Sequence, residues 1–161
     1  MNRNLQILLI EDNDDDAAVF RYALKRAGIP NPLFVATDGQ AAIQYLEGSH
    51  GYEDRLKYPF PSVIFTDIKM PRKTGFDVLE WLRAHPTCSV IPIIVLSGSS
   101  LSEDIKRAYE MGANAYLVKP SDAEVMQKML KITYDFWAIC EKPTLVAKKV
   151  FDATPTPGTE I

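Results

Sequence analysis

Residues 62–75, SVIFTDIKMPRKTG, join a short apolar run to an acid and then a turn. Val63 to Thr66 are apolar or β-branched, which is typical of a strand buried on both faces. Asp67 follows directly, and Pro71 and Gly75 then indicate a tight turn. The stretch therefore predicts a buried strand that ends by presenting one carboxylate at the rim of the core.

Four similar apolar runs occupy residues 5–10, 32–36, 91–97 and 115–119. Apolar residues recur at helical spacing between and after them, over residues 14–27, 38–47, 75–84, 101–111 and 122–140. Five strands alternating with five helices predict a doubly wound α/β fold, a (βα)5 flavodoxin-like arrangement with a parallel sheet covered on both faces. We expect the strand order 2-1-3-4-5.

Residue types at the helix ends support these bounds. Asp38 is expected to cap the second helix. Ser121 is the candidate cap of the last helix, and Glu124 would complete a capping box with it. The apolar face expected for the fourth helix consists of Leu101, Ile105, Ala108 and Tyr109.

Composition excludes several classes of protein. The 161 residues favour one domain, and 18 basic against 21 acidic side chains leave no basic excess for nucleic acid. Cys88 and Cys140 are too far apart for a zinc or redox motif and are expected to be reduced thiols. The first apolar run is too short for a signal peptide or a membrane span. We expect a cytoplasmic protein without a membrane partner.

Two regions depart from the regular pattern. Residues 48–61 form a long link, and links of this length are usually functional or disordered. Residues 1–140 are interpreted as the domain and residues 141–161 as a tail whose end is flexible. Within the tail, LVAKKVF (145–151) is either unstructured, a short strand or a partner contact.

Polar side chains follow four of the five predicted strands. Glu11 and Asp12 follow the first, Asp67 the third, Ser97 ends the fourth and Lys119 ends the fifth. The carboxyl ends of parallel strands share one edge of the sheet, so these residues are expected to meet in one cleft.

Three clustered carboxylates repel one another unless a cation balances them, and Mg²⁺ suits such oxygen ligands. Lys119 adds a positive charge, and the Ser97 hydroxyl can donate to a phosphoryl oxygen. Asp67 is a plausible nucleophile that would form an acyl phosphate. Taken singly, each residue has a simpler interpretation as a solvated or turn residue. For Asp14 to Asp16 we expect only a solvated acidic start of the first helix.

The segments ILLIEDN, VIFTDIKMPRKTG, IPIIVLSGSS and GANAYLVKP together resemble the receiver domain of bacterial response regulators over residues 4–139. The resemblance implies that Asp67 accepts a phosphoryl group from the phosphohistidine of a sensor histidine kinase. It also implies a Mg²⁺ site made by Glu11, Asp12, Asp67 and the backbone carbonyl of Lys69.

The same resemblance assigns further roles. Ser97 and Lys119 would contact the phosphoryl group, and Ser97 with Tyr116 would switch the face formed by the fourth helix, fifth strand and fifth helix. The Lys119–Pro120 bond would be cis. Lys69 and Ser99 would tune the lifetime of the phosphorylated form, because Ser99 offers neither an acid nor an amide to position a water molecule.

A narrower resemblance links the chain to the small regulators that accompany bacterial phytochromes. We interpret it as a stand-alone receiver, a signalling protein and not an enzyme acting on other substrates, whose downstream target the sequence does not identify. Phe136, Trp137 and residues 145–151 are candidate homodimer contacts, although Phe136 and Trp137 also fit an ordinary core at helical spacing.

Other functions on the same fold remain open. An aspartate-nucleophile phosphatase would need a second acid where Lys69 stands. A flavin-binding module would need a loop rich in glycine and hydroxyls where EDNDDD (11–16) stands. A receiver that acts only as a non-phosphorylated adaptor would not need the complete set of site residues.

Overall fold

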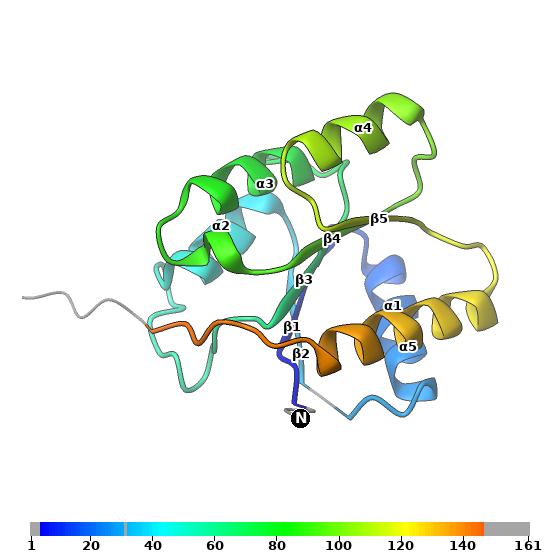
Figure 1. Cartoon of the computed structure of the whole chain (residues 1–161), viewed down its shortest axis with the longest axis horizontal. Coiled ribbons are helices and arrows are strands. Elements are labelled where there is room, and N and C mark those ends of the chain that lie inside the picture. The colour runs from blue at the N-terminus through cyan, green and yellow to red at the C-terminus, as the bar shows by residue number, and fades with distance from the viewer. Residues whose placement is uncertain (1–3, 31, 147–161) are drawn as a thin grey trace, which may run out of the picture.

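The computed structural model describes residues 4–30 and 32–146, and its central element is a five-stranded parallel sheet (Figure 1). The strand order is β2-β1-β3-β4-β5, which confirms the predicted fold class. The inner strands β1, β3 and β4 are buried along their whole length, which explains their continuous apolar sequences. The strands are β1 Ile7–Ile10, β2 Leu33–Ala36, β3 Val63–Thr66, β4 Ile93–Ser97 and β5 Ala115–Val118.

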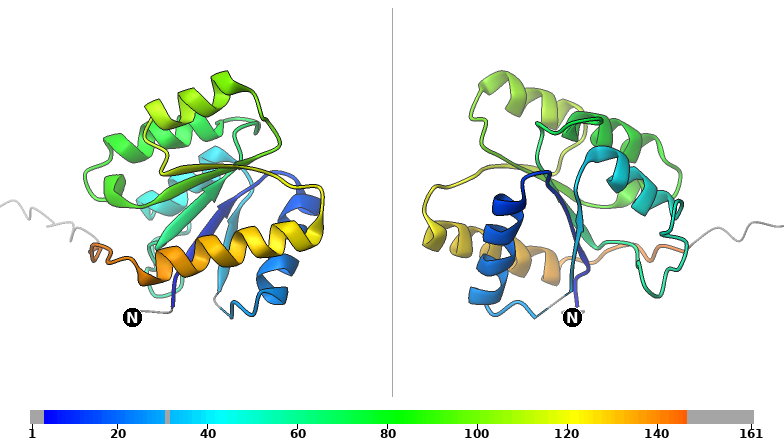
Figure 2. Two further views of the ribbon diagram at one scale, coloured as in Figure 1. Left: turned by 45° about the vertical axis from the view of Figure 1, so that its right-hand side comes forward. Right: turned by 180° about the vertical axis from the view of Figure 1, so that it is seen from behind.

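Helices cover both faces of the sheet. Figure 2 shows α2, α3 and α4 on one face and α1 and α5 on the other. Alternate strand residues serve the two faces: Leu8 and Ile10 join the core beneath α2 and α3, whereas Ile7 and Leu9 join the core beneath α1 and α5. The helices are α1 Asp14–Arg26, α2 Gly39–Glu47, α3 Gly75–Ala84, the short 3-10 helix η1 Cys88–Val90, α4 Ser102–Glu110 and α5 Ala123–Ile139.

The helix starts follow local hydrogen bonding. The Asp38 carboxylate accepts a hydrogen bond from the Ala41 amide at 2.7 Å, so the predicted cap of α2 is confirmed. The Ser121 prediction is wrong by one residue. Asp122 has an extended backbone and accepts from the amides of Glu124 and Val125, so it caps α5.

Half of the predicted inward face of α4 is wrong. Ala108 is buried, but Leu101 is 58% exposed and Tyr109 is 50% exposed. The reason is geometric: α4 packs against the edge strand β5, where little sheet remains to cover its apolar residues.

The link at residues 48–61 is folded, so the disordered alternative is excluded for it. Arg55 donates to the carbonyls of Tyr45 and Leu46 at 2.8 and 2.7 Å, at the C-terminal end of α2. The rings of Tyr52 and Tyr58 contact the ring of Tyr45 and hold the link against the helix.

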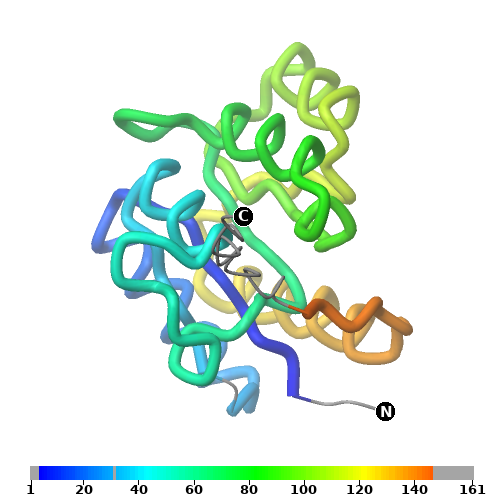
Figure 3. The backbone as a smooth tube through the Cα atoms, turned by 90° about the vertical axis from the view of Figure 1, so that its left-hand side faces the viewer, coloured from blue at the N-terminus to red at the C-terminus, as the bar shows by residue number. Residues whose placement is uncertain are grey.

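After α5 the chain continues in the direction of the helix toward the link at residues 48–61 (Figure 1). Residues 141–146 and residues 59–62 line the same groove, and Figures 1 and 3 show the two segments approaching each other. The remainder of the predicted tail, residues 147–161, lies outside the described residues.

Two further expectations concern the backbone and membranes. No peptide bond among the described residues is cis, so the predicted cis Lys119–Pro120 bond is wrong; trans is the isomer of lower free energy before proline as well. Within residues 4–30 and 32–146, no helix combines the length and apolar character needed to span a bilayer.

Candidate phosphoacceptor site

The pairing of the strands brings the predicted site residues to one edge. Ile10 lies opposite both Ala36 of β2 and Thr66 of β3. The ladder continues one step further, because the Glu11 amide donates to Ala36 at 3.0 Å and the Asp67 amide donates to Ile10 at 3.1 Å. Glu11 and Asp67 therefore leave adjacent strands at the same level.

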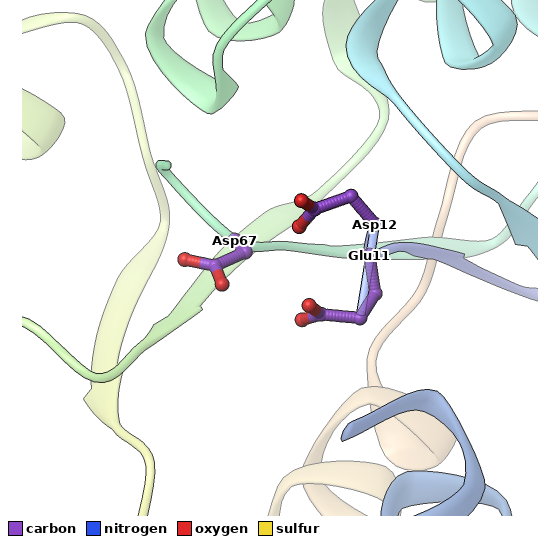
Figure 4. A group of neighbouring side chains, drawn as sticks. All are labelled: Glu11, Asp12 and Asp67. Carbon is purple, nitrogen blue, oxygen red and sulfur yellow. The ribbon is translucent and has the colours of Figure 1, made fainter. Parts of the chain in front are cut away.

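Three carboxylates gather at this edge. Oxygen atoms of Glu11, Asp12 and Asp67 all lie within 4.8 Å of one another, and Figure 4 shows Glu11 and Asp12 directed toward Asp67. Glu11 is buried, Asp67 is half-buried and Asp12 is exposed. Lys69 lines the same surface pocket as Asp12. Hard oxygen donors at this spacing, partly open to solvent, fit a divalent cation such as Mg²⁺.

Lys119 neutralises part of this negative charge. Its Nζ donates to Glu11 at 2.7 Å and to Asp67 and Asp16 at 2.9 Å each. Burial by itself lowers the pKa of Lys119, but the hydrogen bonds to Glu11, Asp67 and Asp16 outweigh it and hold the pKa above its ordinary value. The lysine is therefore a fixed cation at the centre of the acidic group.

Asp16 is a site residue that the sequence analysis missed. It was expected to be part of a solvated helix start, yet its carboxylate reaches Lys119, and Asn13 provides the N-cap of α1 instead. No sequence pattern indicated this contact, because Asp16 belongs to the first turn of α1 and its bond to Lys119 depends on side-chain direction.

Glu11 is the one buried carboxylate among these three acids. Desolvation raises the pKa of its carboxyl group, and the hydrogen bond and charge of Lys119 partly oppose that rise. The Asn13 amide also donates to Glu11 at 3.2 Å. The positive charge of Lys119 therefore favours the ionised form of this buried carboxylate.

The turn after Asp67 is held tightly. The Ile68 amide donates to one carboxylate oxygen of Asp67 at 2.6 Å, and the Gly75 amide donates to the Ile68 carbonyl at 2.9 Å. A Cβ atom at Gly75 would lie only 2.1 Å from the Asp67 carbonyl oxygen, so glycine is required for this approach. Arg72 adopts a left-handed backbone conformation and pairs with Asp38 at the start of α2.

Ser97, Ser99 and Tyr116 form a connected group beside the acids. Ser97 is buried at the end of β4, and its hydroxyl accepts from the Ser99 amide at 3.2 Å. The Tyr116 hydroxyl donates to the Ser99 carbonyl at 2.8 Å. The Lys119 amide donates to the Ser97 carbonyl at 2.8 Å, which continues the pairing of β4 with β5 up to the site.

Residues 7–131 match the response regulator receiver domain. The chain belongs to this family. Response regulator Rcp1 of Synechocystis is 33% identical over 131 residues, which are 81% of this chain and 87% of Rcp1.

Solved structures of receivers share the same fold. The response regulator RPA3017 in red light signaling of R. palustris aligns with a TM-score of 0.81 at 32% identity, over 87% of this chain and 99% of that one. The phosphorylated cyanobacterial phytochrome response regulator RcpA aligns with a TM-score of 0.80 at 29% identity, over 88% and 99%. The Mn²⁺-bound form of Rcp1 aligns with a TM-score of 0.74 at 33% identity, over 89% and 99%.

Proposed function

We propose that this receiver accepts a phosphoryl group on Asp67 from a sensor histidine kinase in a Mg²⁺-dependent reaction. The observation that carries the proposal is the placement of Asp67 within 4.8 Å of Glu11 and Asp12, with Lys119 Nζ 2.9 Å from its carboxylate. A phosphorylated form of RcpA and a Mn²⁺-bound form of Rcp1 among the similar structures support it.

The chemistry follows from these positions. A carboxylate oxygen of Asp67 attacks phosphorus, the bond from phosphorus to the donor nitrogen breaks, and the acyl phosphate keeps the phosphoryl group. Lys119 offers a cation and Ser97 a hydroxyl proton to the phosphoryl oxygens. When bound by Glu11, Asp12, Asp67 and the Lys69 carbonyl, Mg²⁺ supplies positive charge against the transferred group. Lys69 and Ser99, which flank the site, then tune the lifetime of the acyl phosphate.

The proposed output is a change in the α4-β5-α5 face. Ser97 would move toward the phosphoryl group, and Tyr116 of β5 would follow because its hydroxyl is bonded to the loop after Ser97. The phosphoryl group thereby favours one of two arrangements of this face.

The test is intact-mass spectrometry after incubation with Mg²⁺ and acetyl phosphate. One phosphoryl adduct is expected on the wild-type protein and none on Asp67→Asn. Asp15→Asn is the matched control, because Asp15 is an exposed acid of α1 and should leave the adduct unchanged. A wild-type protein without an adduct, or an adduct that persists in Asp67→Asn, would contradict the proposal.

We propose a phytochrome as the kinase partner, because the names of RPA3017 and RcpA connect them with red light and with phytochrome. Phosphotransfer from each autophosphorylated kinase of the source organism should be fastest from a phytochrome. Faster transfer from another kinase would contradict the pairing.

The α5 surface supports a contact with a second copy of the chain. Ile132, Phe136 and Ile139 are 70%, 55% and 61% exposed and follow one helical seam, so Phe136 is not core. Sedimentation should show a dimer that Ile132→Lys converts to monomer, whereas a wild-type monomer at every concentration would exclude this contact.

A further inference from the structure

Ser99 forms hydrogen bonds with residues of three elements of the fold. Its amide donates to the Ser97 hydroxyl on β4 at 3.2 Å. Its own hydroxyl donates to the Asp104 carboxylate on α4 at 2.5 Å. Its carbonyl accepts from the Tyr116 hydroxyl on β5 at 2.8 Å. Ser99 thus joins the proposed phosphoryl-contacting hydroxyl to α4 and β5.

Helix α4 has no side-chain cap, and Ser99 and Asp104 lie at its start. Leu101 occupies the N-cap position and has no side chain that can cap. An acid three residues further on commonly bonds back to the N-cap amide, but Asp104 instead accepts from Ser99. The Leu101 amide reaches Ser99 Oγ at 3.4 Å, so Ser99 and Asp104 together organise the first turn of the helix.

Apolar packing fixes α4 only weakly. Ala108 is the one buried residue of the nine in Ser102–Glu110. Among its other contacts, the Arg107 guanidinium lies 4.1 Å from the centre of the Phe76 ring, and the Tyr109 hydroxyl accepts from the Tyr116 amide at 3.2 Å. Because α4 buries so little apolar surface, individual polar contacts determine its position on the sheet.

Asp104 lies close to the site as well. It lines the surface pocket that Asp12 and Lys69 also line. The start of α4 therefore shares one surface pocket with two residues of the proposed phosphoacceptor site.

We propose that the Ser99–Asp104 hydrogen bond couples the position of the Ser97 hydroxyl to α4, with Asp104 as the positioning residue. The coupling rests on the proposed function, because phosphorylation of Asp67 is its trigger. When Ser97 turns toward the phosphoryl group, the Ser99 amide follows its acceptor. The Ser99 hydroxyl moves with its amide and changes its hydrogen bond to Asp104. The first turn of α4 then shifts with Asp104. A charge-assisted bond is strong enough for this role, whereas a neutral contact of the same length would transmit less.

The link is tested first without phosphorylation, by hydrogen exchange of the α4 amides. Asp104→Ala and Ser99→Ala should speed exchange in α4 by about tenfold, since a hydrogen bond to a charged group is worth at least that factor. Glu103→Ala is the matched control: it removes an exposed acid from the same helical turn and should change exchange by no more than roughly twofold. Asp104→Asn, which keeps an acceptor oxygen, should restore part of the protection.

The coupling is tested next with acetyl phosphate and Mg²⁺. Wild type and Asp104→Ala should gain the same phosphoryl adduct by mass, but only wild type and Glu103→Ala should show an adduct-dependent change in α4 exchange. Full retention of that change in Asp104→Ala would overturn the proposal. So would equal exchange of Asp104→Ala and Glu103→Ala in the unphosphorylated proteins. Absence of any adduct on wild type would instead refute the proposed phosphorylation of Asp67. The exchange measurement on the unphosphorylated proteins would still test whether the Ser99–Asp104 bond holds α4.

Discussion

Gly75 controls how closely α3 approaches the strand that carries Asp67. A Cβ atom there would lie 2.1 Å from the Asp67 carbonyl oxygen and 2.9 Å from the Ile68 Cα, both backbone atoms. Gly75→Ala should therefore lower the free energy of unfolding by roughly 1–3 kcal/mol, despite the better helix propensity of alanine. Urea denaturation monitored by circular dichroism measures this.

Gly98 provides the control for that substitution. A Cβ atom at Gly98 would meet nothing within 4 Å. Gly98→Ala should change the free energy of unfolding by about 0.5 kcal/mol at most. Equal denaturation midpoints for the two variants would show that the close approach at Gly75 is not a constraint.

The two cysteines should react very differently. Burial raises the pKa of the Cys88 thiol to about 11, from an ordinary value of 9.0, and Cys88 is 0% exposed. At pH 8 its thiolate fraction is then roughly a hundredfold lower than normal, and the thiolate is the reactive form. Raising the pH toward 11 would restore the thiolate.

Native protein at pH 8 should therefore gain one alkyl group, on the half-exposed Cys140, and a second only after denaturation. Cys140→Ser should gain none while folded. Peptide mass spectrometry locates the adduct, and rapid labelling of Cys88 in the folded protein would contradict the expected burial.

The sequence predicted those site residues whose positions follow from where a strand ends. Glu11, Asp12, Asp67 and Lys119 each end or follow a strand, and the parallel sheet places their side chains close together. The bonds of Asp16 to Lys119 and of Ser99 to Asp104 depend on side-chain direction. Strand pattern carries no information on that direction, so these contacts required the structure.

At the scale of an element, Arg55 ties the link at residues 48–61 to α2. Its guanidinium donates to Tyr45, Leu46 and Tyr58 carbonyls and lies 4.1 Å from the centre of the Phe60 ring. Arg55→Ala leaves the carbonyls at the C-terminal end of α2 without this donor. The free energy of unfolding should fall by roughly 2 kcal/mol, measured by urea denaturation.

Leu56 offers the neighbouring control. It is 97% exposed, so Leu56→Ala should change stability by about 0.5 kcal/mol at most. Stability losses of the same size in both variants would mean that the link contributes nothing through Arg55.

Elements with strong patterns were predictable, and weakly buried ones were not. Strands β1, β3 and β4 are covered on both faces, so their apolar runs admitted one interpretation. Helix α4 has the same kind of pattern, but polar contacts to Ser99 and Tyr116 fix it, and half of its expected core face is exposed. Hydrophobic periodicity locates a helix without showing how deeply it packs.

At the scale of the whole molecule, the sheet separates two chemically different edges. The carboxyl ends of the strands carry Glu11, Asp12 and Asp67 around Lys119. At the opposite edge, residues 59–62 and 141–146 enclose a groove of about 660 Å³, and Leu145 packs against the main core. A charge change at the first edge does not alter the apolar contacts at the second, so the resulting difference in the free energy of unfolding reports on the first edge.

This separation makes Mg²⁺-dependent stability a measure of charge balance at the site. In wild type, Lys119 already offsets the acids and opposes a second cation, so saturating Mg²⁺ should raise the melting temperature only modestly. Lys119→Met leaves the buried Glu11 beside Asp67 without its cation, which should cost roughly 3–5 kcal/mol in Mg²⁺-free buffer. Mg²⁺ should therefore raise the stability of Lys119→Met by more than it raises the stability of wild type.

Two further variants serve as controls. Asp12→Ala should show the smallest Mg²⁺-induced rise in melting temperature. Lys128 is an exposed lysine of α5, so Lys128→Met should match wild type. An equal Mg²⁺-induced shift in Lys119→Met and wild type, measured by calorimetry, would mean that lysine and metal do not share these carboxylates.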